Sequence, residues 1–406
     1  MTSGTTVSVV VSTLDRADDL RRALTSFEWL DARVAFEVVV VVGPCQDDTD
    51  EVVARWGDSI KVERCDVANL SVSRNVGIRA AAGDIVAFID DDGVPETEWL
   101  SDLVDAYDSA EIGAVGGWVY DHTGVEFQYR FGLVDRLGHF HPAETSSTMH
   151  YAFPGSFVFP HMLGTNSSFR RSVLLEIGGF DEEYEYFLDE SDVHVRLIDA
   201  GYRVRQIEGA YVHHKFAPSA IRRLDRFARN RYSIMKNHTY FARRNAGRHL
   251  TPDQITADID DFIALQRREM SEALERDVID DETFERFESD TRTARDAGEA
   301  SADRPRVLLT DPATPPAFRP FPARGSGVRA VFPISGQSDR ERKWAAARAL
   351  AAEGGIPHVL LPWAPHRHVD FADGVWVHHV QGDPAVAMPR EIDGMRARRT
   401  VDEVRS

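Results

Sequence analysis

Three consecutive aspartates, Asp90, Asp91 and Asp92, follow an apolar run in the stretch AFIDDDGVPETEWL at residues 87–100. No residue adjacent in sequence neutralises them, and burying like charges this close together is unfavourable unless a cation or a proton compensates. Mg²⁺ and Mn²⁺ prefer oxygen ligands, usually one or two carboxylates together with phosphate oxygens. A carboxylate pair at the end of a strand is therefore suited to a divalent metal that arrives with a nucleoside diphosphate and neutralises it as it departs.

Three other interpretations of the aspartates remain open on the triplet alone. An Asp-rich turn can be solvated, bond its own backbone and cap the next helix. A calcium loop fits poorly, because Val94 and Ser101 stand where an EF-hand needs oxygen ligands. The letters DDDGV also resemble the signature of haloacid-dehalogenase phosphatases, with Asp90 as nucleophile and Asp92 as general acid. In that family the signature follows the first strand, whereas here it follows the fourth expected strand.

Two further stretches carry groups that could do chemistry. DESD, residues 189–192, lies at the start of an expected helix, where capping alone could explain the acids. A positioned carboxylate there could also take a proton from an attacking hydroxyl group. HHK, residues 213–215, follows an expected strand. A lone buried histidine is usually structural, but a histidine beside two aspartates is a plausible metal ligand.

The elements expected to position these groups alternate between strands and helices. Strands are expected at residues 5–12, 36–43, 60–65 and 84–92, and helices at 15–30, 47–57 and 70–83. Because the strands are short, apolar and β-branched, they indicate an open α/β sheet that is mostly parallel and flanked by helices. Ligands of such sheets bind outside the carboxyl ends of the strands. The aspartates, STLDR after the first strand and GPCQDD after the second all lie there.

Beyond residue 110 the pattern changes, and three domains are expected: 1–240, an acidic helical extension at 241–304, and a small α/β domain at 305–406. The linker ASADRPR separates the last two. The remaining expected elements are a strand at 114–121, a loop-rich stretch at 132–147, helices at 166–180 and 189–201, a strand pair or one bent strand at 202–214, mostly helix at 219–300, strands at 306–310, 329–334, 357–363 and 374–380, and a helix at 339–354.

Charge and composition limit the possible partners and location. The net charge of −19 over 406 residues argues against nucleic-acid binding. Residues 253–304 hold 17 acidic residues against 7 arginines, and the basic segment 221–248 precedes them. Two cysteines indicate a reducing compartment, and no apolar run approaches the roughly 18 residues of a membrane span. The first residues predict a strand and not a signal peptide, so a cytoplasmic location is expected.

Five blocks resemble a family 2 glycosyltransferase of the GT-A fold, in the right order over roughly residues 6–235. VSVVVSTLDR resembles the opening strand and nucleotide loop, and LSVSRNVGIRAAAGDIVAFIDDDGVPETEWL the middle block with its Asp-x-Asp motif. LGTNSSFRRSVLLEIGGFDEEY resembles the acceptor-side block, YFLDESDVHVRLIDAGYRV the acidic helix, and VHHKFAPS the late metal-histidine segment. The resemblance implies a GT-A nucleotide-sugar-binding fold and metal-dependent sugar transfer.

The resemblance also implies residue roles on the donor side. It assigns Asp92, Asp90 and His214 to a Mn²⁺ or Mg²⁺ ion, with His213 as the alternative histidine. Asp90 would also contact the ribose side of the nucleotide, and Asp91 the sugar or solvent. The remaining expected nucleotide-sugar contacts are Thr13, Asp15 and Arg74. One departure concerns the base: many members have acids after the second strand, whereas this chain has Val42-Gly43-Pro44.

On the acceptor side, the resemblance implies inverting single displacement. Glu190 is the expected catalytic base, with Asp189 as the alternative, and Asp192 is expected to hold the acceptor or cap the helix. Arg222, Arg226 and Arg229 are expected on one helical face, where they would attract an anionic acceptor. The alternative is that these arginines only pair with the acidic segment.

The expected partners are a nucleoside-diphosphate sugar and a glycan, lipid-linked or other hydroxyl acceptor, in cell-surface polysaccharide or glycoconjugate assembly. A lipid-linked acceptor would add peripheral contact with the inner face of the membrane. A competing hypothesis is a nucleotide-sugar-binding protein that has lost turnover. The C-terminal segment weakly resembles the amino-terminal half-domain of family 4 glycosyltransferases, which have the GT-B fold. A docking or structural role is the alternative for this segment.

Overall fold

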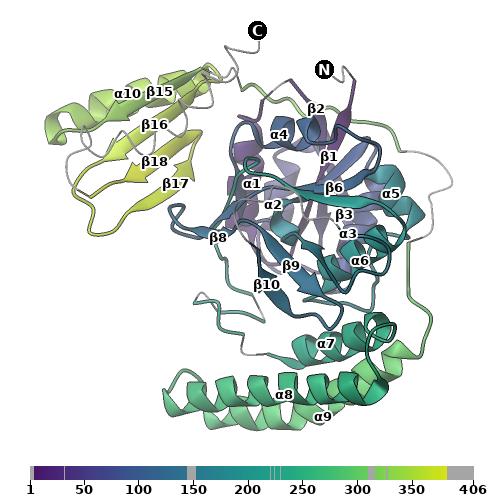
Figure 1. Cartoon of the computed structure of the whole chain (residues 1–406). Coiled ribbons are helices and arrows are strands. Elements are labelled where there is room, and N and C mark those ends of the chain that lie inside the picture. The colour runs from purple at the N-terminus through teal and green to yellow at the C-terminus, as the bar shows by residue number, and fades with distance from the viewer. Residues whose placement is uncertain are drawn as a thin grey trace.

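The computed structural model describes most of the chain, and Figure 1 shows a central α/β body with a helical region on one side and a small C-terminal sheet on another. The described residues are 4–31, 33–143, 152–219, 221–223, 225–228, 230–309, 316–325 and 328–381. Among them, no helix is both long enough and apolar enough to span a bilayer.

The body is built on a seven-stranded sheet in the order β13-β6-β12-β4-β1-β2-β3. β1, β2, β3 and β4 are mutually parallel, and β12 alone runs antiparallel to both of its neighbours. The expected mostly parallel sheet is confirmed. The strands are β1 (Thr6–Thr13), β2 (Ala35–Val42), β3 (Lys61–Arg64), β4 (Ile85–Phe88), β6 (Ile112–Gly116), β12 (Ser167–Arg170) and β13 (Arg203–Gln206).

Helices cover the sheet because its central strands carry apolar side chains on both faces. All of Val38–Val42 in β2 are fully buried, as a parallel strand between two helical layers requires. α1 packs Leu20, Leu24 and Phe27 into this core, as its 3.6-residue period predicts. The helices of the body are α1 (Ala17–Phe27), α2 (Thr49–Ala54), α3 (Leu70–Ala80), α4 (Trp99–Asp105), α5 (Arg171–Glu176) and α6 (Asp189–Asp199).

Two smaller sheets lie at the carboxyl ends of the central strands. The first has the order β5-β14-β7-β8 and pairs His214 of β14 with Gly93 of β5, so the histidine and the aspartates are neighbours across a strand pair. In the second sheet, of order β10-β9-β11, β9 and β10 form a hairpin and β11 pairs with the other edge of β9. The strands are β5 (Gly93–Pro95), β14 (Val212–His214), β7 (Val119–Tyr120), β8 (Phe127–Tyr129), β9 (Gly132–Asp135), β10 (Phe140–Pro142) and β11 (Val158–His161).

The helical region consists of α7 (Tyr232–Asn245), α8 (Pro252–Glu275) and α9 (Asp281–Ala302). α7 runs across the boundary expected at residue 240. The C-terminal unit has the strand order β15-β16-β18-β17 with one helix, α10, as expected for a small α/β domain. Its elements are β15 (Arg329–Pro333), α10 (Gln337–Ala352), β16 (Ile356–Leu361), β17 (His368–Ala372) and β18 (Val375–His379).

Four local predictions are wrong. The helix expected at 166–180 begins as β12, because this segment completes the sheet between β4 and β6. The strand pair expected at 202–214 does not form, since β13 and β14 join different sheets. No helix forms among the described residues between 219 and 231; α7 begins at Tyr232. Of the strand expected at 306–310, the described residues 306–309 form no strand, and Leu309 packs against the body; residue 310 lies outside the described residues.

A buried carboxylate in β2 connects the sheet with two distant segments. Glu37 is fully buried; its Oε1 accepts hydrogen bonds from Ser8 Oγ and the Ala82 amide, both at 2.7 Å. Its Oε2 lies 2.8 Å from both Lys61 Nζ and the Arg319 amide. Nothing in the apolar run FEVVVVV indicates this network, since its partners lie far away along the chain.

We expect Glu37→Gln to lower the free energy of unfolding by about 3–5 kcal/mol, because it leaves the nearly buried Lys61 without its counter-charge. Chemical denaturation would measure the change. The matched control is Glu51→Gln on the exposed face of α2, which should change stability by less than about 0.5 kcal/mol. Equal effects of the two substitutions would show that the Glu37 network does not stabilise the fold.

Candidate active site

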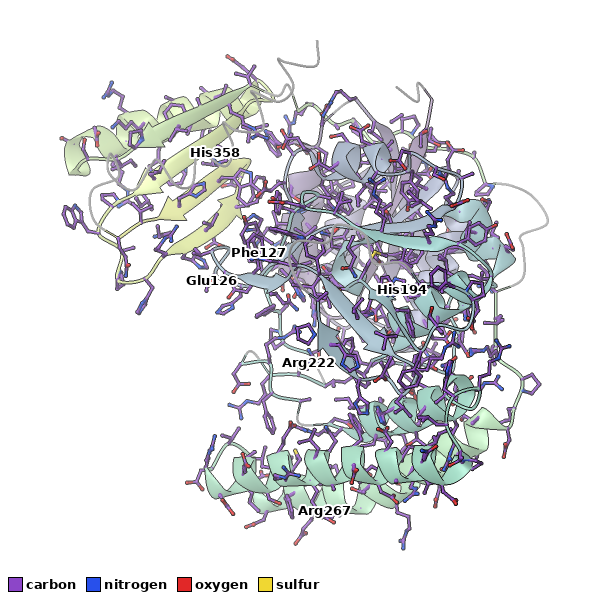
Figure 2. All side chains as sticks on the ribbon, in the orientation of Figure 1. Glu126, Phe127, His194, Arg222, Arg267 and His358 are labelled. Carbon is purple, nitrogen blue, oxygen red and sulfur yellow. The ribbon has the colours of Figure 1, made fainter. Side chains whose placement is uncertain are left out.

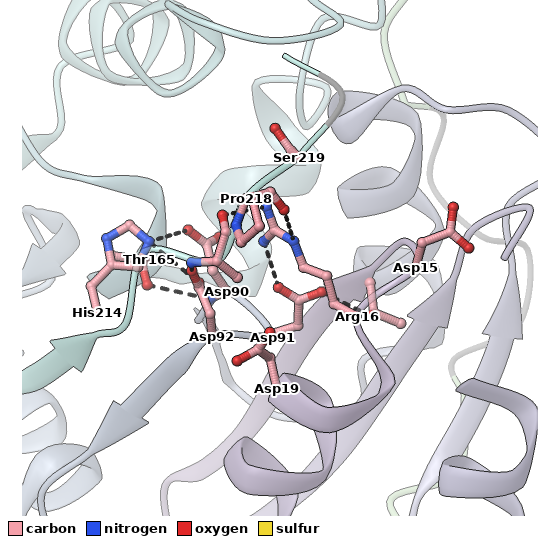
Figure 3. A network of polar contacts seen from close by, with 12 residues as sticks. Asp15, Arg16, Asp19, Asp90, Asp91, Asp92, Thr165, His214, Pro218 and Ser219 are labelled. Carbon is pink, nitrogen blue, oxygen red and sulfur yellow. Dashed lines mark hydrogen bonds and ion pairs between the residues drawn. The ribbon is translucent and has the colours of Figure 1, made fainter. Parts of the chain in front are cut away.

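The aspartates follow β4, as expected, and the fold brings His214 to them (Figure 3). His214 Nε2 lies 3.3 Å from Asp92 Oδ1 and 3.9 Å from Asp90 Oδ2. One ligand atom from each of the three residues can lie within 4.8 Å of the others. Asp90 keeps 34% of its side chain exposed, whereas Asp92 is almost fully buried. The group is therefore open on the Asp90 side.

The donor set fits a divalent metal ion. Asp92 Oδ1 is buried and has no hydrogen-bond donor among the described residues. His214 Nδ1 lies 2.8 Å from Gln128 Oε1, a contact in which Nδ1 donates its proton and leaves the Nε2 lone pair directed at the aspartates. Burial opposes ionisation of Asp92, but a positively charged partner at the His214 position, the charge of Arg16 and the Ala217 amide outweigh it and lower the pKa of Asp92 to about 2. A metal ion bound at His214 Nε2 would supply the same positive charge as a proton there. Asp92 is thus ionised and available as a ligand.

Asp91 points away from this group and joins three chain segments. Its carboxylate accepts hydrogen bonds from Thr13 Oγ1 at 2.8 Å and from Arg16 Nη1 at 2.9 Å. Arg16 also donates to the carbonyl oxygens of Ala217 and Pro218, just after His214. Burial raises the pKa of Asp91 to about 7 in spite of Arg16. Asp91 and Thr13 are therefore buried and hydrogen-bonded within the protein, and they hold chain segments in position instead of facing an open site.

Asp15 lies at the carboxyl end of β1, beside the segment that follows β2. Its Oδ1 accepts a hydrogen bond from the Gln46 amide, at 2.6 Å, and its backbone has a positive φ of 54°. The side chain is exposed, so it is accessible to a ligand at this edge of the sheet. Whether Asp15 contacts a nucleotide stays a prediction.

A second acidic group faces the first, with a buried arginine between them. Arg74 Nη2 lies 3.9 Å from Asp90 Oδ1, and its Nη1 pairs with Asp189 and lies 3.1 Å from Glu190 Oε1. Asp189 and Glu190 open α6, as expected. Arg74 is nearly inaccessible to water, which excludes the surface arginine that a helix face alone would suggest.

The two acids of this second group differ in protonation. Burial and the Glu190 charge raise the pKa of Asp189 well above its usual range. Burial would also raise the pKa of Glu190, but Arg74 and a hydrogen bond from Asp189 outweigh it and lower the value to about 2. The directions of these shifts favour Glu190 as the ionised member of the pair, and only an ionised carboxylate can accept a proton.

Two of the residues expected to bind the acceptor, Asp192 and Arg222, do not have the surroundings that the sequence predicted. Asp192 is fully buried, and its two oxygens pair with Arg196 and Arg306, each at 2.7 Å, which favours a structural role. Arg222 lies on the irregular segment between β14 and α7 (Figure 2). The helical face that was to align it with Arg226 and Arg229 does not exist, and Arg229 lies outside the described residues.

Sequence reasoning missed several residues that shape the site. Gln128 orients His214, and Arg16 fixes the segment after it; the letters STLDR contain Arg16 but do not reveal its partners. Lys215, the residue next to His214, donates a hydrogen bond to the Val369 carbonyl and lies 3.0 Å from Asp370 Oδ1. The C-terminal unit therefore contacts the chain directly beside His214. A further residue, Gly164, lies so close to Glu190 and Arg74 that a Cβ atom would be 2.0 Å and 2.2 Å from their polar atoms.

Comparison with known proteins shows which family part of this chain resembles. Residues 8–178 match the model of glycosyl transferase family 2. The matched segment is thus similar to a glycosyltransferase domain over less than half of the chain, and the expected GT-A fold class is confirmed for the body. The match includes the aspartates, Arg74 and Gly164, and it ends before α6 and His214. The resemblance of the C-terminal segment to family 4 stays a prediction.

Two curated relatives and one solved structure illustrate the likeness. The glucosyl-dolichyl phosphate glucuronosyltransferase of Haloferax volcanii is 32% identical over 44% of this chain, which covers 59% of that protein. The pre-mycofactocin glycosyltransferase of Mycobacterium tuberculosis is 26% identical over 51% of this chain, which covers 42% of it. The chain thus spans about half the length of these relatives. The mannosyltransferase PcManGT from Pyrobaculum calidifontis, solved with GDP-Man and Mn²⁺, is 18% identical with a TM-score of 0.44; the match covers 74% of this chain and 88% of that one.

If the chain transfers sugar, as these similarities suggest, we expect Gly164→Ala to reduce that transfer by about 10²-fold, since displacing reacting groups by about 1 Å has effects of that size. The atoms that the new methyl group meets are ends of flexible side chains, so the thermal midpoint should change little. Steady-state transfer and thermal denaturation would be measured together. Gly247→Ala, where a methyl group meets open space, is the control. A normal transfer rate for Gly164→Ala would show that Glu190 and Arg74 need not keep their positions.

Proposed function

We propose that this protein transfers a sugar from a nucleoside-diphosphate donor to a hydroxyl acceptor, with inversion at the anomeric carbon. The observation that carries the proposal is the position of Arg74, between the Asp90 group and Glu190. This arrangement offers metal ligands for a diphosphate on one side and an ionised carboxylate on the other. A single displacement needs the leaving group and the base on opposite sides of the reacting carbon, and no covalent enzyme intermediate.

On the donor side, we propose that Asp90, Asp92 and His214 hold Mn²⁺ or Mg²⁺. When bound, the ion would neutralise the charge that develops on the departing diphosphate. Asp15 is proposed to contact the nucleotide at the edge of β1, while Arg16 and Thr13 keep the Asp91 segment in place. Val42, Gly43 and Pro44 offer no side-chain hydrogen bond for a base, so base recognition falls to other groups.

On the acceptor side, we propose that Glu190 takes the proton of the attacking hydroxyl group. Its ionised state supports this role, whereas Asp189, held neutral by burial, is suited to orienting Glu190 by a hydrogen bond. A haloacid-dehalogenase-like phosphatase is not favoured, because Asp90 follows the fourth strand along the chain and not the first. A nucleotide-sugar-binding protein without turnover remains the alternative, and kinetics distinguishes it.

A screen of nucleotide sugars by thermal shift, with and without Mn²⁺, tests the proposal and identifies the donor. Asp92→Ala should lose the Mn²⁺-dependent stabilisation by the donor. Glu190→Gln should keep it while transfer falls by about 10²–10⁴-fold. Asp189→Asn should retain far more transfer than Glu190→Gln, because Asp189 is already neutral.

Each other outcome contradicts one part of the proposal. Donor stabilisation that is independent of Mn²⁺, or unchanged in Asp92→Ala, would contradict the metal assignment. Active Glu190→Gln with inactive Asp189→Asn would exchange the two roles. Donor binding without transfer to any acceptor would favour the binding protein.

We also propose an anionic acceptor, such as a lipid-linked phosphate sugar reached at a membrane surface. Arg222 stacks over Tyr186 at 5.3 Å and Arg226 over Phe216 at 4.4 Å, while the Arg222 Nε is buried without a hydrogen bond to the described residues. Burial and Arg222 lower the pKa of Arg226, and the charges of Asp92 and Asp90 oppose this shift, so the pair lies near the donor site. The name of the Haloferax volcanii relative mentions glucosyl-dolichyl phosphate, an acceptor of this class.

Replacing Arg222 and Arg226 together by Gln should raise the KM for a lipid-phosphate acceptor about tenfold or more and weaken its salt dependence. The donor KM should stay unchanged. Arg223→Gln is the matched control from the same segment, because Arg223 already pairs with Asp225 and the Val278 carbonyl. A normal acceptor KM in the double variant, or a raised donor KM alone, would assign the arginines to another role.

A further inference from the structure

A second group of metal-binding side chains lies between the helical region and the body. His139 comes from the turn between β9 and β10, His238 from the middle of α7, and Asp258 from α8. His139 Nε2 lies 2.7 Å from Asp258 Oδ1, and His238 Nε2 lies 3.3 Å from Asp258 Oδ2. One ligand atom from each residue lies within 4.8 Å of the others. This group shares no residue with the donor site.

Contacts outside the group fix the turn that carries His139 and the ring of His238. Asp135 Oδ1 accepts the amide protons of Leu137, Gly138 and His139, which fixes the turn that carries His139. The His238 ring is fully buried and stacks on Phe262 with centroids 3.6 Å apart and an angle of 9°. Phe262 lies one turn after Asp258 on α8, so the same helix face supplies the carboxylate and supports the imidazole. Such preorganisation reduces the entropy lost on binding an ion.

We infer that His139, His238 and Asp258 bind a zinc-class transition-metal ion. Two imidazole nitrogens and one carboxylate oxygen suit Zn²⁺, whereas Mn²⁺ and Mg²⁺ favour oxygen ligands like those of the donor site. Ligand bonds of 2.0–2.2 Å in a tetrahedron put neighbouring ligand atoms about 3.3 Å apart, the separation already present between His238 and Asp258. His139 contacts the other oxygen of Asp258, at 2.7 Å; because its side chain is partly exposed, it can move outward by about half an ångström to reach the same separation.

The surroundings supply the negative charge that a divalent ion needs. Asp258 provides one carboxylate, and Asp135, whose Oδ1 accepts the His139 amide proton and whose Oδ2 lies 2.9 Å from His141 Nε2, provides a second one beside the group.

An ion at this position would join the helical region to the segment that carries the catalytic base. Gly138, next to His139, lies so close to Leu188 that a Cβ atom there would be 3.0 Å from Leu188 Cδ1, and Leu188 directly precedes Asp189. The site therefore connects α7, α8 and the β9–β10 turn behind the start of α6. Its role is structural: it would stabilise the folded chain in proportion to its occupancy.

The test is a calorimetric titration of the full-length, EDTA-stripped protein with Zn²⁺. The background carries Asp92→Asn, to remove the donor site, and Cys45→Ser, because Asp15, Cys45 and Asp47 form another group of potential ligands. We expect one equivalent of Zn²⁺ to bind and to raise the thermal midpoint. Co²⁺ in place of Zn²⁺ should give the strong visible absorption of a tetrahedral site.

His139→Ala in the same background should abolish both signals, and because His139 is partly exposed the variant should fold. His141→Ala is the matched control: it removes a histidine from the same hairpin that contacts Asp135 and no member of the group. Asp258→Asn gives a second loss-of-ligand variant on the other side of the site. If the background protein binds no Zn²⁺, or if His139→Ala binds it as well as His141→Ala does, the three residues form only a hydrogen-bonded contact and the inference is wrong.

Discussion

The compensation of buried negative charge determines how this site is built. Asp90, Asp189 and Glu190 approach one another around the single guanidinium of Arg74, which is sealed from water beneath Phe88 and Phe180. Three carboxylates around one cation leave an excess of negative charge that a low-dielectric interior does not tolerate. A proton shared within the Asp189–Glu190 pair would remove part of this excess, and the raised pKa of Asp189 favours that residue as its holder. The accessible Asp90 side leaves room for a cation to remove the rest.

The same constraint explains why the segment after β14 is held so firmly. His214 and the Ala217 amide both face Asp92, while Arg16 connects Asp91 with the carbonyl groups of Ala217 and Pro218. Lys215, between these contacts, is held from the other side by Asp370 of the C-terminal unit. Trp376 of that unit also packs on His213, with ring centroids 4.7 Å apart. The C-terminal unit is thus joined to the body at the strand that carries the metal-ligand candidate.

The helical region is attached by polar contacts as well as by packing. Lys236 of α7 pairs with Glu183 and Glu185 in the segment that leads to α6, and Arg306, after α9, reaches Asp192. The acidic character of residues 253–304 therefore has a specific component, since several of its acids have defined partners, such as Asp258 and Glu299. Arg222 and Arg226 have aromatic partners instead, so the basic and acidic segments do not simply pair with each other.

The sequence alone determined which strands form the parallel core and where their carboxyl ends fall. Apolar β-branched runs and helical periods are local signals, so the positions of Asp90 to Asp92, of the acids that begin α6 and of the strand before His214 followed from them. The tertiary structure decided which of these groups meet. Arg74 contacts acids 115 and 116 residues away, and Gln128 contacts His214 86 residues away. Pairings at such separations depend on how sheets and loops pack.

Packing also decided which local preferences were overruled. The residues that begin the expected helix at 166–180 became β12, because a strand there closes the gap between β4 and β6. Arg222 and Arg226 do not lie on a helix. They lie on the irregular segment between β14 and α7, where their guanidinium groups stack over Tyr186 and Phe216. Asp192, indistinguishable in sequence from its acidic neighbours, became structural because Arg306 arrives from beyond the helical region to neutralise it. A one-dimensional pattern does not contain that partner, whereas the folded chain does.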